Sequence, residues 1–197
     1  MKVIFMGTPD FSVGTLEALV EAGHEVVLAV SQPDKPKGRG KEMQFTPVKE
    51  CALKYNIPVY QPTSLKNGEL SDLLSELAPE MIVVVAYGKI LPKYILDFPK
   101  FGCVNLHGSL LPKYRGSAPI QHAVLNGDEV TGVSTMLMDE GMDTGAILLT
   151  SEVKIEDNDT SESMFDKLSV VGADLLLETV NKIEDITPVP QDEALAT

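Results

Sequence analysis

An amide and an imidazole lie two residues apart near the middle of the sequence, and a carboxylate follows in a glycine-flanked segment. They are Asn105, His107 and Asp143. Asn105 and His107 belong to the apolar run 103–107, which predicts a buried strand, and alternate side chains of a strand point to the same face. A histidine can take up a proton near neutral pH, and an amide N–H can stabilise an oxygen that gains negative charge. This combination suits acyl transfer to an amine without a covalent enzyme intermediate.

Three other interpretations of these residues stay open from the residues alone. A single histidine in an apolar strand is often a buried core residue. A serine hydrolase would need a base for Ser109, whose evident partner is His107 itself, and the sequence has no Gly-x-Ser-x-Gly segment. A metal site needs at least three ligands, which His107, His122 and Asp143 could supply only if the fold brought them together.

The whole sequence is acidic and long enough for one domain of generous size, with 197 residues and a formal net charge of −13. This charge argues against general adhesion to nucleic acid or anionic membranes but leaves room for a local basic patch. Cys51 and Cys103 lack CxxC spacing and are expected to be reduced, buried thiols. The longest apolar runs fall short of the roughly 20 residues of a membrane span, and the apolar start is too short for a signal peptide. We expect a cytoplasmic protein, monomeric and without membrane contacts.

The pattern of apolar runs predicts an α/β fold with a Rossmann-like, doubly wound and mostly parallel sheet. Expected strands occupy residues 2–6, 25–30, 58–60, 81–86, 103–107, 131–138 and 147–155. Amphipathic helices are expected between them and over 161–183, and the helix after Ser117 is expected to use that serine as its N-cap. The loop after the first strand lacks GxGxxG, so a dinucleotide site is unsupported. Ligands of such sheets bind beyond the carboxyl ends of the strands, so residues 87–92 should edge a pocket.

The segment 31–41 is a local exception to the acidic composition. It contains two prolines, two glycines and four cations, Lys35, Lys37, Arg39 and Lys41, with one aspartate. Since no apolar residue anchors it, we expect a mobile surface loop. Its charge suits either plain exposure to solvent or contact with phosphates.

Several short segments resemble the formyltransferases that use 10-formyltetrahydrofolate as the formyl donor. They are NLHGSLLP at 105–112, YRG at 114–116, API at 118–120 and DEGMDTG at 139–145. Three further segments, 5–11, 32–40 and 83–88, resemble the branch of this family that formylates methionyl initiator tRNA. The resemblance covers nearly the whole chain. It implies the formyltransferase fold and a one-carbon transferase of translation initiation.

The resemblance also implies roles for individual residues. Asn105, His107 and Asp143 correspond to the catalytic triad. Folate contacts are implied for Tyr87, Gly88, Ile90, Leu91, Ser109, Leu110, Leu111, Pro112, Asp139 and Gly141. Contacts with tRNA are implied for Lys35, Lys37, Arg39 and Lys41, and no metal is implied.

Two alternatives to tRNA formylation remain, and the domain organisation adds an expectation of its own. A family member that formylates a small amine, such as glycinamide ribonucleotide or an amino-sugar nucleotide, would share the triad but have no use for the basic loop. A folate- or tRNA-binding module without turnover is the other alternative. The family carries a second, β-rich domain after the catalytic one. We therefore expect residues 1–190 to form the catalytic domain and residues 191–197 to begin a linker to an absent domain.

Overall fold

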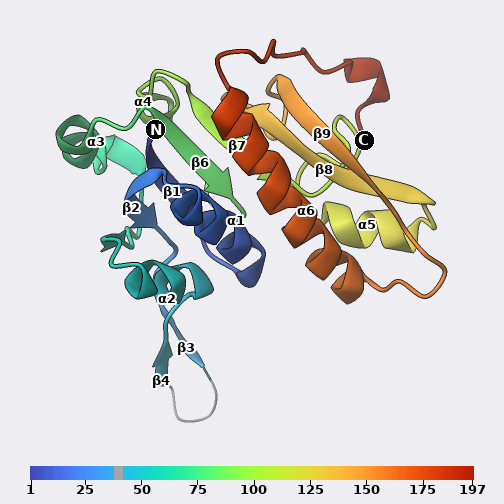
Figure 1. The fold of residues 1–197 in the computed structure, drawn as a ribbon, viewed down its shortest axis with the longest axis horizontal. Helices are drawn as coiled ribbons and strands as arrows, with labels where there is room; N and C mark the ends of the chain where they lie inside the picture. The colour runs from blue at the N-terminus through green and yellow to red at the C-terminus, as the bar shows by residue number, and fades with distance from the viewer. Residues whose placement is uncertain (38–41) are drawn as a thin grey trace. The chain divides into compact units, whose positions relative to one another are not determined.

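The structure is a computed structural model that describes residues 1–37 and 42–197 (Figure 1). These residues form two compact units, 1–103 and 104–197. The sequence-based boundary at residue 190 stays a prediction.

The first unit is built on four parallel strands in the order β5-β2-β1-β6. The strands are β1 (Lys2–Gly7), β2 (Glu25–Val30), β5 (Val59–Tyr60) and β6 (Met81–Val85). Its helices are α1 (Asp10–Glu21), α2 (Pro47–Lys54), the 3-10 helix η1 (Lys66–Gly68), α3 (Ser71–Leu77) and α4 (Lys93–Leu96). Every residue of β6 is buried, as expected for a continuous apolar run in a parallel sheet. Helices α1 and α2 pack against each other and against these strands (Figure 1).

The second unit contains three antiparallel strands in the order β7-β8-β9. They are β7 (Cys103–His107), β8 (Val130–Leu137) and β9 (Ile147–Lys154). Helix α5 (Pro119–Leu125) connects β7 to β8, and α6 (Ser161–Lys182) and the 3-10 helix η2 (Glu193–Leu195) follow β9. The long helix α6 packs across β8 and β9 (Figure 1). Its Gly172 lies against β7, because a Cβ there would be 2.7 Å from Cδ2 of Leu106. Leu106 therefore faces α6, and the alternation of a strand turns Asn105 and His107 to the opposite face.

The expected α/β fold with a mostly parallel sheet is confirmed, and the two late strands β8 and β9 pair antiparallel. The predicted cap of α5 is wrong. Its N-cap is Ala118, in the left-handed conformation with φ 60°, and no side chain caps the helix. The proline at the first helical position needs no hydrogen-bond acceptor, so the helix start loses little without a cap from Ser117.

The mobile surface loop expected over 31–41 contains a strand in its described part. Strand β3 (Lys35–Lys37) pairs antiparallel with β4 (Glu42–Gln44), so a hairpin begins here. Polar bonds hold the base of this hairpin. Asp34 accepts hydrogen bonds from Nζ of Lys49 and, at 2.8 Å, from Nε2 of Gln61. The absence of apolar residues in the segment 31–41 therefore does not predict whether it is ordered at this point.

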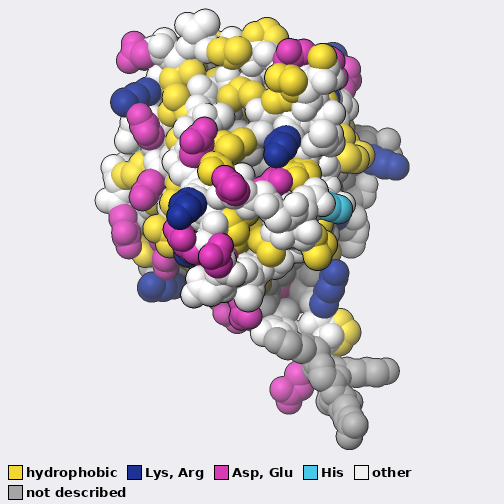
Figure 2. All heavy atoms as spheres, turned by 90° about the vertical axis from the view of Figure 1, so that its right-hand side faces the viewer, with side chains coloured by type: hydrophobic (Ala, Val, Ile, Leu, Met, Phe, Trp, Pro, Cys, Tyr) yellow, Lys and Arg dark blue, Asp and Glu magenta, His cyan; other side chains and the backbone are white. Residues whose placement is uncertain are grey.

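Both cysteines are free and buried, as predicted. Burial raises the pKa of the Cys51 thiol to about 11 and that of Cys103 to about 12, so neither is a reactive thiolate at neutral pH. Within the described part of the chain, no helix is long and apolar enough to cross a membrane. On the face shown in Figure 2, acidic side chains are spread between basic ones and form no field of a single sign.

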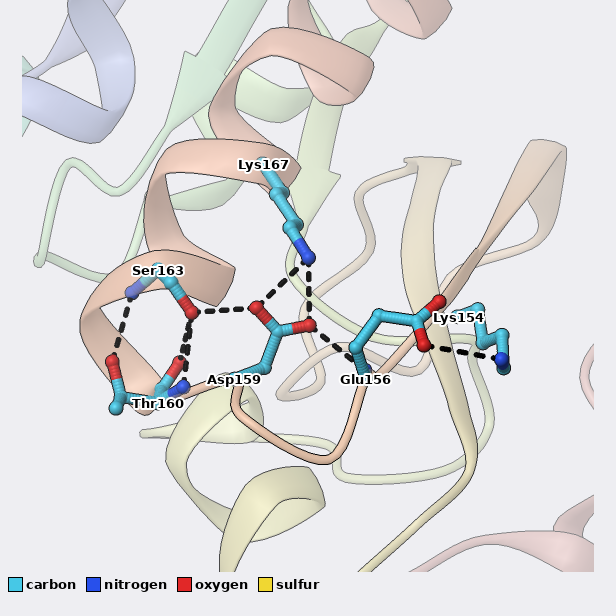
Figure 3. A network of polar contacts seen from close by, with 6 residues as sticks. All are labelled: Lys154, Glu156, Asp159, Thr160, Ser163 and Lys167. Atoms are coloured by element: carbon cyan, nitrogen blue, oxygen red, sulfur yellow. Dashed lines mark hydrogen bonds and ion pairs between the residues drawn. The ribbon is translucent and has the colours of Figure 1, made fainter.

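A polar network holds the start of α6 (Figure 3). The helix opens with a capping box, in which Oγ1 of Thr160 accepts from the backbone N of Ser163 at 3.2 Å and Oγ of Ser163 accepts from the backbone N of Thr160 at 2.9 Å. The carboxylate of Asp159 accepts from Nζ of Lys167 at 2.6 and 2.8 Å, from the backbone N of Glu156 at 2.8 Å, and from Oγ of Ser163 at 2.7 Å. These bonds, with that of Lys167 the strongest, lower the pKa of Asp159 to about 2.

Replacing Asp159 with asparagine is expected to lower the melting temperature by a few degrees at pH 7. Because the folded-state pKa is about 2 against an ordinary value of 3.8, the carboxylate stabilises the fold above pH 3.8. This contribution is lost as the pH falls toward 2, so the difference between variant and parent should shrink below pH 4. Thermal unfolding of both proteins between pH 7 and pH 3, followed by circular dichroism, measures this difference in melting temperature. Asp157→Asn removes a charge from the same turn but none of these hydrogen bonds, and an equal loss in that variant would contradict the prediction.

Candidate active site

His107 ends strand β7, is 7% exposed, and has a defined hydrogen-bonding state. Its Nε2 lies 2.7 Å from the backbone oxygen of Tyr114. A carbonyl oxygen can only accept, so Nε2 must carry the hydrogen. The open nitrogen is therefore Nδ1, which is the one that can take up a proton from a substrate.

Asp143 faces that open nitrogen. Its Oδ2 lies 3.6 Å from Nδ1 of His107, and the two side chains are 19% and 8% exposed. The same oxygen accepts a hydrogen bond of 2.8 Å from the backbone N of Gly116, which fixes the direction of the carboxylate. Solvent screens such a sheltered pair weakly. Asp143 is thus placed to stabilise the imidazolium that forms when His107 gains a proton.

Asn105 lies beside His107 on the same face of β7 and is 9% exposed. The register with β8 pairs Asn105 with Met136 and His107 with Ser134. An amide N–H next to a proton acceptor can donate to an oxygen that becomes negative while the imidazole accepts a proton from an attacking amine. The structure therefore brings Asn105, His107 and Asp143 together within the second unit. If His107 were only a core residue, the positions of the Asn105 amide and the Asp143 carboxylate beside it would have no explanation.

The turn after β7 is held by serine hydroxyls. Oγ of Ser109 donates to the backbone oxygen of Lys113 at 2.5 Å, and Oγ of Ser134 donates to the backbone oxygen of Ser109 at 2.7 Å. The backbone N of Leu111 in turn donates to Oγ of Ser134 at 3.0 Å. Ser109 is fully buried and shapes the turn, so this geometry gives no support to a serine nucleophile. Of the implied folate contacts in this turn, Leu111 is buried, whereas Leu110 and Pro112 are half-buried.

The loop between β8 and β9 carries Asp143 and is shaped by close backbone contacts. Oδ1 of Asp139 accepts from the backbone N of Gly141 at 2.9 Å and from Oγ1 of Thr144 at 2.7 Å. At Gly145 a Cβ would lie 1.6 Å from the backbone oxygen of Leu137, so only glycine fits there. Asp139 and Gly141 are both exposed.

The remaining implied folate contacts belong to the first unit. The side chain of Tyr87 is 1% exposed in the core of this unit, where burial raises its pKa to about 12. Only the backbone of Tyr87 is accessible to hydrogen-bonding partners. The backbone oxygen of Tyr87 accepts a hydrogen bond from Nε2 of Gln32 at 3.1 Å. Ile90 is 81% exposed, whereas Leu91 is 3% exposed. Gly88 is exposed as well, so Ile90 and Gly88 are the most accessible of the implied contacts in this segment.

A cavity of about 640 Å³ lies in the first unit beyond the carboxyl ends of β1, β2 and β6, where the sequence places one. Its walls include Thr8, Gln32 and Tyr87, and the hairpin contributes Lys35. Lys35 is exposed. Lys37 lies in β3, and the implied tRNA contacts Arg39 and Lys41 fall outside the described residues.

The structure does not assemble the ligand set of a metal site from His107, His122 and Asp143. His122 lies on α5 and is exposed, with its ring stacked 6.1 Å from that of Tyr114. Across residues 1–37 and 42–197, no group of three or more His, Cys, Asp or Glu side chains is arranged to hold a metal ion.

Four residues that support the triad were not assigned a role from the sequence. The backbone of Tyr114 and Gly116 holds His107 and Asp143, while Arg115 and Gln191 contact the same loops. The segment YRG at 114–116 carries a signal only through the family resemblance. The sequence does not indicate a role for Gln191, because this residue lies in a polar stretch without hydrophobic periodicity.

Comparison with known proteins gives a consistent picture. The family model described as formyl transferase matches residues 1–180. A methionyl-tRNA formyltransferase of Agathobacter rectalis is 59% identical over 199 residues, covering 100% of this chain and 64% of the relative. That of Thermodesulfovibrio yellowstonii is 54% identical, covering 96% of this chain and 62% of the relative. The chain thus spans less than two thirds of the length of these relatives.

Solved structures agree at the level of the fold. The phosphoribosylglycinamide formyltransferase of Bacillus halodurans matches with a TM-score of 0.77 and 28% identity, covering 93% of this chain and 95% of that one. An N-formyltransferase of Helicobacter canadensis, solved with folinic acid and dTDP-3-aminofucose, has a TM-score of 0.74 and 20% identity, covering 100% of this chain and 70% of that one. Together with the family match and the Asn105–His107–Asp143 geometry, these similarities show that the chain belongs to the formyl transferase family.

Proposed function

We propose that the chain transfers the formyl group of 10-formyltetrahydrofolate to the α-amino group of methionyl initiator tRNA, in the cytoplasm, at the start of translation. The observation that carries the chemistry is Nδ1 of His107, open for a proton, facing Asp143 and lying beside Asn105. The relatives named methionyl-tRNA formyltransferase support the choice of acceptor, and so does a basic hairpin in an otherwise acidic chain.

In the proposed reaction the methionine amine attacks the formyl carbon, and the bond from that carbon to the folate nitrogen breaks. The Asn105 amide donates to the formyl oxygen while negative charge develops there, a contribution typically worth about 10²–10³ in rate. His107 accepts the amine proton at Nδ1 and can return it to the departing nitrogen. Asp143 stabilises the imidazolium between these steps.

The residues proposed for folate are compatible with a flat, partly apolar ligand. In the first unit, the exposed Ile90 lines a cavity of about 400 Å³ together with Leu65 and Pro92. Nζ of Lys89 is held by the backbone oxygens of Pro62 and Thr63, both at 2.8 Å, and so leaves this rim mainly apolar. In the second unit, the exposed loop at Asp139 and Gly141 offers polar groups. Folate contacts at Tyr87, Gly88, Ile90, Leu91, Ser109–Pro112, Asp139 and Gly141 remain predictions.

An acceptor competition tests the proposal. The same formyl donor is offered with charged initiator tRNA, with glycinamide ribonucleotide and with an amino-sugar nucleotide, and single-turnover rates are measured at high tRNA concentration. We expect transfer to the tRNA alone. Transfer to a small amine instead would favour the alternative to which the phosphoribosylglycinamide and sugar formyltransferase structures point. Binding of tRNA or folate without any transfer would identify a binding module.

The hairpin supplies a second arm of this experiment. Lys35→Gln should weaken tRNA binding and reduce its salt slope by roughly one unit, because one phosphate contact is lost. Lys182→Gln, at the end of α6, is the matched control, since Nζ of Lys182 already bonds Glu178 at 2.7 Å. Equal slopes for both variants would assign Lys35 to plain solvent exposure.

A further inference from the structure

The segment 189–197 returns to the two loops that hold the triad. Nε2 of Gln191 donates to the backbone oxygens of Asp143 and Gly145, at 2.8 and 2.7 Å. Nearby, Val189 forms a backbone bridge with Ile147, with both hydrogen bonds 2.8 Å long. The side-chain amide of Gln191 therefore spans two carbonyls of the loop on which Asp143 lies.

Arg115 connects Gln191 to the other loop. Its Nε donates to Oε1 of Gln191 at 2.9 Å, and its two terminal nitrogens bond the Glu193 carboxylate at 2.8 and 2.9 Å. The Arg115 side chain is 14% exposed, whereas that of Glu193 is 73% exposed. Arg115 is thus held by two contacts, a sheltered hydrogen bond to Gln191 and a bidentate ion pair with Glu193 that is more open to solvent.

Arg115 stands between the two backbone groups on which the triad depends. The residue before it, Tyr114, supplies the oxygen that holds Nε2 of His107, and the residue after it, Gly116, supplies the N–H that holds Asp143. The backbone N of Arg115 also donates to the backbone oxygen of Thr197 at 2.9 Å. Tyr114, Gly116 and Asp143 all have positive φ, at 55°, 82° and 54°. Conformations of this kind persist where surrounding contacts enforce them.

We propose that Gln191, with Arg115, is a positioning residue that sets the distance between Asp143 and His107. It acts by joining the backbone of the Asp143 loop to the Tyr114–Gly116 turn. The inference rests on the proposed function for its effect on rate, but its structural content stands apart from any activity. It also assigns a role inside the catalytic unit to a segment that the sequence suggested was only a linker.

The test compares Gln191→Ala, Gln191→Glu and the control Val189→Ala in the whole chain. Gln191→Glu keeps an acceptor for Arg115 but sets an oxygen against two carbonyls. Val189→Ala changes a side chain that is 58% exposed and leaves the backbone bridge intact. Hydrogen exchange of the Gly116 amide, followed by NMR, should accelerate about tenfold in both Gln191 variants and not in the control. Unchanged exchange in a folded Gln191→Ala protein would overturn the proposal.

Formyl transfer gives the second readout. Gln191→Ala should lower the single-turnover rate about tenfold at saturating substrates, because small misplacements of catalytic groups are costly. In an Asp143→Asn background the same change should cost less than about twofold, since the positioned carboxylate is already gone. An equal loss in both backgrounds would indicate general damage and refute the positioning role. If the parent chain transferred no formyl group, the proposed function would fail, while the exchange rates would still decide this inference.

Discussion

Replacing His107 with glutamine is expected to lower the rate of formyl transfer by about 10²–10⁴-fold while the chain stays folded. Glutamine can keep a donor for the backbone oxygen of Tyr114, which Nε2 of His107 contacts at 2.7 Å. It has no group that gains a proton near neutral pH, so the amine proton loses its acceptor. The variant thus separates the chemical role of His107 from its structural one.

Single-turnover transfer to charged initiator tRNA at saturating donor measures the loss, and circular dichroism with thermal unfolding checks the fold. His122→Gln is the matched control, because His122 is exposed on α5 in the same unit. We expect that control to stay within a few-fold of the parent. A rate close to the parent in folded His107→Gln would show that the proton leaves by another route and would end the mechanism proposed above.

The strand that carries this histidine was predictable for a simple physical reason. A strand buried on both faces consists almost wholly of apolar residues, so a polar side chain in it needs an explanation. Asn105 and His107 are such exceptions in β7, and their spacing of two residues puts them on one face. Asp143 was a candidate because Gly141 and Gly145, two residues to either side, leave room for a ligand to approach. At Gly145 the backbone of Leu137 leaves no room for a Cβ.

What the sequence could not predict depends on backbone groups and on single polar bonds. The Tyr114 oxygen and the Gly116 N–H hold the triad, yet every residue type has a backbone oxygen and every type except proline has a backbone N–H. The hairpin at Lys35 is likewise fixed through Asp34 and Lys49, without an apolar pattern. Gln191 was hidden for the same reason, since its partners are carbonyl oxygens. Such contacts leave no periodic signal in a sequence.

The second large effect is expected for Asp143→Asn, which tests the charge of the third member of the triad rather than its shape. Oδ2 of Asp143 both accepts from the backbone N of Gly116 and faces His107. In the variant, the amide oxygen must take this position, because an NH₂ group there would oppose the Gly116 N–H. Asparagine therefore keeps the loop and the distance to His107 but removes the negative charge.

We expect the rate of transfer to fall by about 10²–10³-fold, with folate and tRNA binding changed less than threefold, since the imidazolium forms only during the reaction. Single-turnover rates and equilibrium binding, measured on the same preparation, give the two quantities. Glu140→Gln is the control, because it removes one negative charge from an exposed position of the same loop. If both variants lost the same rate, the charge of the loop as a whole would matter and its position beside His107 would not. A selective loss in Asp143→Asn means that the charge at 3.6 Å from Nδ1 drives the proton uptake by His107.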